Sequence, residues 1–350
     1  MFSGYRALEK HRFLLQDPVR TNSFRKAIFK VVKEGDVVID LGAGSGILSF
    51  FAYQAGAKKI YAIEKGNIIE ATKRIARKNG MSDKITFINE DSRIVRLPEK
   101  VDVIVSECIG HFALGGSMIS ALTNMRDNYL KKGGVIIPGS ISMFIVPVQS
   151  FRHYQHVNFW ERNAAYGFDF HPAQEMASNN VYLATMKPRD FIAAPQKIAA
   201  MDLFRDHPNE MLDIKAGFSI PKACVMHGLC GWSEVDLCAG VSFSTSPAHK
   251  TTVWQQVFFP LEKEISLKKN SVVDLHLTLR RSEDNLCSCL NWTIWVTRLG
   301  KRKIIARQST KKSFPFDYKG ICASNECDPN IDGKERNRRL EELARELKDL

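Results

Sequence analysis

The chain has 350 residues, of which 44% are hydrophobic and 25% charged, and its formal net charge at pH 7 is +12. This length can bury one large core or two medium ones. Pro, Gly or a charged residue interrupts every apolar run before it reaches 18 residues, so we expect no membrane-spanning helix and no membrane partner. The N-terminus lacks the apolar stretch of a secretory signal, which predicts a cytoplasmic protein. The eight cysteines lack zinc-ligand spacing, so we expect no metal site.

The first part of the chain predicts two helices and then an alternation of strands and helices. Apolar residues recur at helical spacing over residues 5–31, and the segment QDP at 16–18 interrupts them. Four short apolar runs then predict strands, at residues 36–42, 58–64, 84–91 and 101–107. Three further segments predict helices, at residues 46–56, 67–80 and 118–134. This alternation is typical of a doubly wound, largely parallel sheet.

The pattern changes after residue 141, where we place a domain boundary. Four segments alternate apolar and polar residues, namely VSFSTSP, TTVWQQVFF, SVVDLHLTLR and LNWTIWVTR. Such alternation predicts the strands of an antiparallel sheet or barrel. The last segment, residues 333–350, predicts a charged helix with leucines along one stripe, which is typical of a docking face.

A glycine-rich turn follows the first predicted strand. The segment VVIDLGAGSGILS places Gly42, Gly44 and Gly46 between that strand and the next helix. Glycines at such a turn let the backbone approach a ligand and direct helix amides toward it. A dinucleotide site has its third glycine one residue later, where Ile47 stands in this chain.

Acidic residues follow or end each predicted strand of this sheet. Glu64 ends the second strand, where a carboxylate can accept both hydroxyls of a ribose, and Asp91 is placed to take an adenine amine. Together with Asp40 and Glu107 they favour S-adenosylmethionine over a nicotinamide cofactor. An NAD-dependent oxidoreductase is the alternative, and it requires that NADH binds.

The same residues resemble the protein arginine N-methyltransferase family, a class I methyltransferase group. The likeness covers most of the chain and rests on these segments: HRFLLQDPVRT, VIDLGAGSGILS, YAIE, EDS, SECIGHFALGGSM, ERNAAYGFDF, GVSFSTSP and TTVWQQVFF. It implies S-adenosylmethionine as cofactor and S-adenosylhomocysteine as product. It further implies cofactor contacts from His11 and Arg20, with Arg20 pairing with the methionine carboxylate. Gly42, Gly44, Glu64 and an adenine loop with Asp91 and Ser92 would complete the cofactor site, beside Asp40.

The resemblance also implies the domain organisation and the partners. Residues 1–32 would form helices that cover the cofactor, and residues 33–140 a Rossmann-like domain. Residues 141–330 would form a β-barrel-like substrate domain with a helical dimerisation arm at about 160–195, and residues 331–350 a charged helix. The arm implies a homodimer, and the family implies a protein substrate that presents arginine.

Two departures from the family concern the reaction itself. Family members grip the substrate guanidinium with two glutamates, because arginine is a cationic and weakly nucleophilic acceptor that must be oriented. Glu107 matches the first glutamate, whereas the second falls on Gly116. The family's Thr-His-Trp signature stands as Thr252, Val253 and Trp254 here, so the histidine that pairs with an acid matching Asp17 is missing.

Three hypotheses follow from these departures. The first is a methyltransferase that acts on protein arginine and uses Glu107 as the orienting acid. The second keeps the scaffold and methylates a nucleic acid or a small molecule, since Gly116 and Val253 make the pocket less acidic and the basic clusters suit phosphates. Those clusters lie at residues 73–78, 262–269 and 301–312, where each could also be an ordinary solvated face. The third is a cofactor-binding dimer without turnover. His111 in the same loop could act as a base or serve only as a hydrogen-bonded loop residue.

Overall fold

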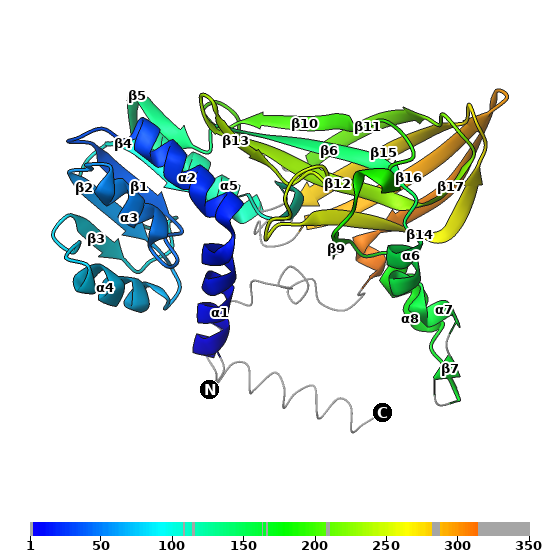
Figure 1. The fold of residues 1–350 in the computed structure, drawn as a ribbon, viewed down its shortest axis with the longest axis horizontal. Coiled ribbons are helices and arrows are strands. Elements are labelled where there is room, and N and C mark those ends of the chain that lie inside the picture. Colours follow the sequence, from blue (N-terminus) through cyan, green and yellow to red (C-terminus); the bar gives the residue numbers. More distant parts are fainter. Residues whose placement is uncertain are drawn as a thin grey trace.

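The fold was analysed in a computed structural model, which describes residues 3–107, 109–113, 116–162, 164–165, 167–207, 211–281 and 288–313. A Rossmann-like domain and an elongated antiparallel domain lie side by side, with an arm projecting from the second (Figure 1). Within the described ranges, no helix is long and apolar enough to cross a membrane. The predicted C-terminal helix at 331–350 lies outside these ranges.

The Rossmann-like domain is built on a five-stranded parallel sheet in the order β3-β2-β1-β4-β5. Its strands are β1 (Val37–Leu41), β2 (Lys59–Ile63), β3 (Ile85–Ile88), β4 (Val101–Ser106) and β5 (Leu130–Ile137). The helices between them are α3 (Ile47–Gln54), α4 (Ile69–Lys78) and α5 (Gly116–Tyr129). All five residues of β1 are buried, as expected for the central strand of a sheet covered on both faces. The strand order reverses at β1, where ligands of such sheets bind.

The helix predicted at 118–134 is too long at its C-terminal end. The structure ends α5 at Tyr129, and Leu130 already pairs with Val101 as the first residue of β5. The register between β4 and β5 shifts between Val101 and Val103, and Gly134 lies where a Cβ would come within 2.9 Å of the Asp102 carbonyl oxygen. This close approach of two backbones is a tertiary requirement, and helical spacing gives no sign of it.

Two N-terminal helices precede the sheet, α1 (Ser3–Gln16) and α2 (Pro18–Val31). Pro18 opens α2 directly after Asp17, whose side chain caps the helix by accepting the amide hydrogen of Arg20 at 3.0 Å. Proline suits the first helical position because its missing N–H would have no partner there. One face of α2 packs into the core of the Rossmann-like domain through the buried side chains of Phe24, Ala27 and Ile28.

The second domain consists of two antiparallel sheets around a common core. One sheet contains β6 (Ser140–Val148), β9 (Tyr182–Ala184), β10 (Gln196–Asp202), β12 (Cys224–Cys238), β13 (Val241–Ser244) and β14 (Gln256–Leu267). The other has the order β11-β15-β16-β17, with β11 (Met211–Ser219), β15 (Val272–Arg281), β16 (Ser288–Arg298) and β17 (Lys301–Ser309). The core between them includes Leu229 and Phe259 of the first sheet and Leu277 and Trp292 of the second.

The strand predicted at TTVWQQVFF begins later than its alternation suggests. β14 starts at Gln256 and runs to Leu267, whereas Thr252 to Trp254 lie in a turn. The ring of Trp254 stacks on Phe243 with centroids 4.9 Å apart, and Thr252 is buried as well. Val253 and Trp254 also pack against the core of the Rossmann-like domain, so the apolar residues of this turn hold the two domains together.

The arm lies between β6 and β9. It comprises α6 (Phe151–Val157), α7 (Phe159–Arg162), β7 (Ala164–Ala165), β8 (Phe168–Asp169) and α8 (Pro172–Ser178), and it extends away from the barrel (Figure 1). Single-turn 3-10 helices stand at η1 (His111–Ala113), η2 (Pro188–Asp190) and η3 (Thr310–Lys312). The fold thus consists of a Rossmann-like sheet followed by a barrel-like domain with an arm, which confirms the predicted fold class.

Candidate active site

The register of the parallel sheet brings the predicted acids to one edge. Leu41 of β1 pairs with Ser106 of β4 and with Ile63 of β2. The residues that follow these three positions are Gly42, Glu107 and Glu64, so they leave the sheet at the same level. The hydroxyl of Ser106 donates to the Leu41 carbonyl at 2.8 Å and fixes this level.

The glycine turn requires glycine at each of its three positions. Gly42, Gly44 and Gly46 have φ values of 74°, 53° and 82°, which L side chains rarely adopt. A Cβ on Gly44 would come within 2.5 Å of the His11 ring, and one on Gly42 within 2.9 Å of the Met118 side chain. The turn is therefore a shallow cradle of bare backbone, closed from above by side chains of α1 and α5.

Glu64 lies directly against this turn. One carboxylate oxygen accepts the amide hydrogen of Gly44 at 3.0 Å, and the other accepts that of Gly66 at 2.7 Å. Two backbone amides thus fix the carboxylate next to the glycine cradle, where the sequence predicts a ribose contact. Thr72 of α4 donates its hydroxyl to the Gly44 carbonyl at 2.6 Å. Sequence reasoning missed Thr72 and Met118, because their helices reach the turn only through the tertiary fold.

Asp40 is fully buried and faces the first turn of α3. Its Oδ2 accepts the backbone amide hydrogen of Ser49 at 2.8 Å and the Ser49 hydroxyl hydrogen at 2.6 Å. Burial raises the pKa of Asp40 to about 6, against the lowering effect of these two hydrogen bonds. The contacts of Asp40 connect strand and helix on either side of the glycine turn, and they give it a supporting position.

Asp91 and Ser92 lie in the loop after β3, at the edge of this group. The Asp91 carboxylate accepts two hydrogens from the Arg93 side chain, at 2.9 and 2.7 Å, and the Arg93 backbone amide hydrogen at 3.0 Å. The Arg93 guanidinium lowers the pKa of Asp91 to about 2. The structure therefore keeps Asp91 ionised and pairs it with Arg93, while Ser92 stays half-buried beside it.

His11 of α1 covers the glycine cradle. Burial, together with the charges of Lys10 and Arg20, lowers the pKa of His11 to about 4, so the ring is neutral at pH 7. A neutral ring can lie close to backbone and to Arg20 without charge repulsion. The neutral His11 ring thus allows α1 to pack directly against the glycine turn, where the N-terminal helices are expected to cover the cofactor.

Arg20 and Glu107 form an ion pair that the sequence did not predict. Arg20 Nη2 lies 3.3 Å from Glu107 Oε2, and the two side chains are 6% and 15% exposed. Arg20 Nη1 also donates to the Leu14 carbonyl at 3.5 Å, while its buried Nε has no hydrogen-bond partner among the described residues. The predicted catalytic acid therefore already holds one guanidinium, and one buried donor of that guanidinium has no partner among the described residues.

Asp17 retains two partners although the histidine of the family signature is absent. Its Oδ1 accepts the amide hydrogen of Arg20 at 3.0 Å, and its Oδ2 accepts that of Val253 at 2.8 Å. The backbone of residue 253 thus bonds to Asp17 where the resemblance led us to expect a histidine side chain. Asp17 joins α2, which carries Arg20, to the turn of the barrel domain.

His111 is engaged by the barrel domain as well. Its Nδ1 lies 2.8 Å from the Trp254 carbonyl oxygen. Because a carbonyl oxygen only accepts, Nδ1 carries the hydrogen and donates it. This bond ties the Glu107 loop to the barrel, and it fixes the tautomer in which Nε2 carries the lone pair, so it is compatible with both interpretations of His111.

The residues at this edge fit an adenosyl cofactor with a carboxylate. The glycine turn lets the backbone come close to a ligand without side chains of its own, Glu64 and Asp91 supply carboxylates after neighbouring strands, and Arg20 offers a buried cation whose Nε has no partner among the described residues. The sheet order and this donor set together define a class I, S-adenosylmethionine-dependent methyltransferase.

Comparison with known proteins agrees with a class I methyltransferase and identifies the family within that class. The family model "Arginine methyltransferase oligomerization subdomain" matches residues 140–296, and "Ribosomal protein L11 methyltransferase (PrmA)" matches residues 21–144. Protein arginine N-methyltransferase 6 of Danio rerio is 33% identical over 337 residues, covering 91% of this chain and 93% of that protein. Protein arginine N-methyltransferase 1 of Saccharomyces cerevisiae is 30% identical, covering 81% and 84%.

Solved structures show the same fold. Arabidopsis thaliana protein arginine methyltransferase 10 superposes with a TM-score of 0.77 at 25% identity, covering 89% of this chain and all of that one. A Trypanosoma brucei PRMT1 enzyme–prozyme heterotetramer with S-adenosylhomocysteine gives a TM-score of 0.77 at 22% identity, covering 85% and 97%. The chain belongs to the protein arginine N-methyltransferase family, and its cofactor is S-adenosylmethionine.

Proposed function

We propose that this protein transfers a methyl group from S-adenosylmethionine to a guanidinium nitrogen of arginine in a protein substrate. Membership of the arginine methyltransferase family supports the reaction. The observation that carries it on the structural side is the position of Glu107, which follows β4 at the level of Gly42 and whose carboxylate pairs with the Arg20 guanidinium.

Glu107 would hold and orient the acceptor. A carboxylate at this position accepts hydrogens from the substrate guanidinium, draws positive charge away from the reacting nitrogen and fixes the direction of its lone pair. The bound cofactor supplies a methyl group on a sulfonium, whose thioether is a good leaving group. One proton leaves the nitrogen that gains the methyl group, and Glu107 is positioned to accept it.

Arg20 would act as a positioning residue in this scheme. Its single charge can pair with Glu107 or with the carboxylate of the cofactor, and α2 holds it through the Asp17 cap. Binding of a carboxylate to Arg20 weakens its hold on Glu107 and makes that acid available to the substrate. This supports binding of cofactor before substrate.

The remaining predicted residues would bind the cofactor. We assign the ribose hydroxyls to Glu64 and the adenine amine to the loop with Asp91 and Ser92, with His11 and the glycine turn enclosing the rest. Asp40 supports the turn through Ser49 and need not touch the cofactor.

The first prediction tests the role of Glu107. Incubation with methyl-labelled S-adenosylmethionine and a panel of arginine-containing peptides should yield methylarginine, detected by mass spectrometry after hydrolysis. Glu107→Gln should lower the rate on the order of a thousandfold, because loss of an electrostatic contact to the transition state costs that much. Binding of S-adenosylhomocysteine, measured by calorimetry, should persist.

The matched control is Glu99→Gln, which removes a carboxylate that pairs with Lys59 and Tyr61 away from the cradle. It should leave the methylation rate within about twofold. Methyl transfer to RNA but to no peptide would contradict this proposal and support a nucleic acid as the methyl acceptor. Cofactor binding without any transfer would support the non-catalytic dimer.

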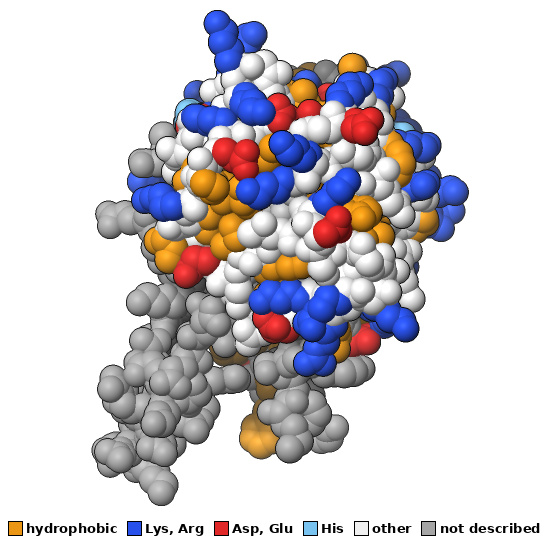
Figure 2. Space-filling model, turned by 90° about the vertical axis from the view of Figure 1, so that its left-hand side faces the viewer, with side chains coloured by type: hydrophobic (Ala, Val, Ile, Leu, Met, Phe, Trp, Pro, Cys, Tyr) orange, Lys and Arg blue, Asp and Glu red, His pale blue; other side chains and the backbone are white. Residues whose placement is uncertain are grey.

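We further propose that the protein forms a homodimer through its arm. The arm exposes Phe168 and Phe170 at 68% and 37%, more apolar surface than an isolated projection would keep in water. The Rossmann-like domain exposes Phe29 and Ile75, and Figure 2 shows apolar side chains gathered between basic ones on the face that this domain presents. The arm of one copy would cover that face of the other.

A further inference from the structure

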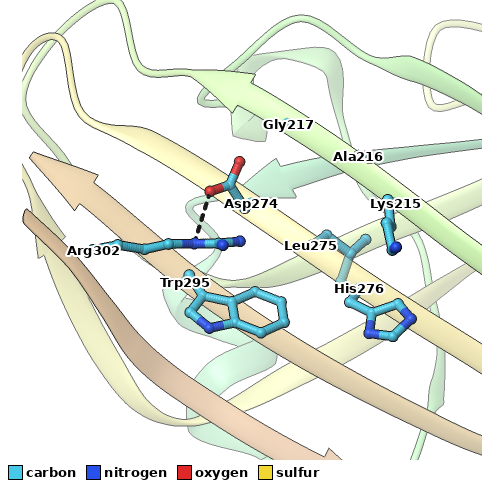
Figure 3. A pocket seen from close by; sticks show the side chains of 8 residues that line it. All are labelled: Lys215, Ala216, Gly217, Asp274, Leu275, His276, Trp295 and Arg302. Carbon is cyan, nitrogen blue, oxygen red and sulfur yellow. Dashed lines mark ion pairs between the residues drawn. The ribbon is translucent and has the colours of Figure 1, made fainter. Parts of the chain in front are cut away.

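A second candidate site lies on the outer face of the four-stranded sheet. A cavity of about 500 Å³ opens there between β11, β15, β16 and β17. Its lining includes Lys215, His276, Trp295 and Arg302, and the Asp274 carboxylate lies next to the bare backbone at Gly217 (Figure 3). None of these residues belongs to the proposed active site, and the methyl-transfer mechanism does not use them.

An aromatic ring and two opposite charges form the floor of this cavity. The guanidinium carbon of Arg302 lies 4.6 Å from the centroid of the Trp295 ring. The same guanidinium pairs with Asp274, its Nε lying 3.4 Å from Oδ2 (Figure 3). The two partners are 54% and 32% exposed, so water and a ligand can reach both. A planar group that enters the cavity meets an indole, a stacked cation and a carboxylate.

A row of polar side chains crosses the sheet next to this floor. Lys215 pairs in register with His276, His276 with Thr293, and Thr293 with Arg307. Residues in register on neighbouring strands share one face of a sheet. The row therefore presents cationic ends at both edges of the sheet, with hydrogen-bonding groups between them.

The hairpin tips beside the cavity are strongly basic. Val272 pairs with Thr297, which brings the β14–β15 turn and the β16–β17 turn to the same end of the barrel. Exposed cations at this end are Lys268, Lys269, Arg298, Lys301, Arg302 and Lys303. All of them except Arg298 belong to two of the three basic clusters in the sequence. Figure 1 shows this end of β16 and β17 far from the Rossmann-like domain.

We propose that this face binds single-stranded nucleic acid. An unpaired base would stack in the cavity on the Arg302 guanidinium, which Trp295 supports from below, and would offer its exocyclic amine to Asp274, while the tip cations neutralise the phosphates that follow. An acidic peptide matches the face less well, because its carboxylate side chains offer no planar ring to occupy the cavity beside Trp295 and Arg302. Duplexes are disfavoured because their bases are already stacked and paired.

This inference is independent of the proposed methyl transfer, since binding is measured without cofactor. The experiment uses the full chain and fluorescein-labelled 12-nucleotide single strands of RNA and of DNA, followed by fluorescence anisotropy. Trp295→Ala should weaken binding about tenfold, and Trp295→Phe, which keeps an aromatic face, should restore most of it. Reversal of two tip cations, Lys301→Glu with Lys303→Glu, should lower both the affinity and the slope of its salt dependence.

The matched control reverses two cations on another basic face, Arg74→Glu with Arg77→Glu on α4. It should leave binding within about twofold. Methylation of peptides by Trp295→Ala should equal that of the wild type, which separates this site from the active site. The inference is overturned if the α4 variant weakens binding as much as the tip variant does. It is also overturned if a duplex binds equally well, or if a polyglutamate peptide displaces the strand at equal charge.

Discussion

At the residue scale, the strand-end acids of this sheet do different things although they look alike in the sequence. Glu64 is held by two backbone amides, Asp91 by an arginine, and Glu107 by Arg20. Asp40 is completely buried, and within the described part of the chain its carboxylate accepts hydrogen bonds from Ser49 alone. Burial and partner therefore decide the chemistry of each carboxyl group.

The pH dependence of stability should report the burial of Asp40. Its folded pKa of about 6 lies above the ordinary value of 3.8, so between these two values the folded state binds more protons than the unfolded state. The free energy of unfolding contributed by Asp40 should therefore fall by about 2 kcal/mol as the pH rises from 4 to 7. Urea unfolding of wild type and Asp40→Asn at several pH values measures this difference.

The exposed Asp83 provides the control for that experiment. Asp83→Asn should track the wild type across the whole range, so that its stability difference stays flat. A flat difference for Asp40→Asn as well would mean that the carboxyl group is solvated in the folded protein.

Residue types and their positions could be predicted for Glu64, Asp91 and Glu107, because parallel strands end at one edge of the sheet. The pairing of Glu107 with Arg20 could not be predicted, since the two residues are 87 positions apart in the sequence. The hydrogen bond between Asp17 and Val253 could not be predicted either, because its donor is a backbone amide, which every residue type except proline offers.

At the element scale, Asp17 determines where α2 begins and where it is anchored. Its carboxylate caps α2 and holds the turn at residue 253, so one side chain connects the N-terminal helices with the barrel domain. Boundaries elsewhere were harder to predict. Leu130 and Lys131 suit a helix, yet pairing with β4 places them in β5. Local preference was overridden by the sheet partner.

Removal of the Asp17 side chain should destabilise the protein by about 2 kcal/mol, because a helix cap is lost and the amide of Val253 is left without its partner. Asp17→Asn preserves the cap, since asparagine caps helices equally well, and brings an amide group toward the Val253 amide. It should therefore cost less than Asp17→Ala in urea unfolding while still lowering the affinity for S-adenosylhomocysteine. Equal stability of all three proteins would contradict the assigned role.

At the scale of the whole molecule, two surfaces of opposite character lie on different parts of the chain. The arm exposes Phe168 and Phe170, for which we propose self-association, and the far end of the barrel exposes cations, for which we propose a polyanionic ligand. The net charge of +12 is consistent with a polyanionic partner but does not say where it binds. The spatial separation would let the dimer present two basic ends.

Dimerisation should depend on the arm. Phe168→Glu places a charge in the proposed interface and should shift sedimentation velocity profiles from dimer to monomer, with the dimer dissociation constant raised at least tenfold. Leu299→Glu is the control, because Leu299 is 88% exposed at the opposite end of the barrel and should leave the dimer unchanged. A monomeric wild type at micromolar concentration would refute the interface.

The sequence by itself determined the Rossmann-like sheet, the glycine turn and the acids at the strand ends, because strand periodicity and glycine conformation are local properties of the chain. It also contained the family signature and its two departures at Gly116 and Val253. Only the tertiary structure decided which groups hold Glu107 and Asp17, because those contacts join segments far apart in the chain. The same is true of the cavity at Trp295, where cross-strand register assembles residues of four strands on one face.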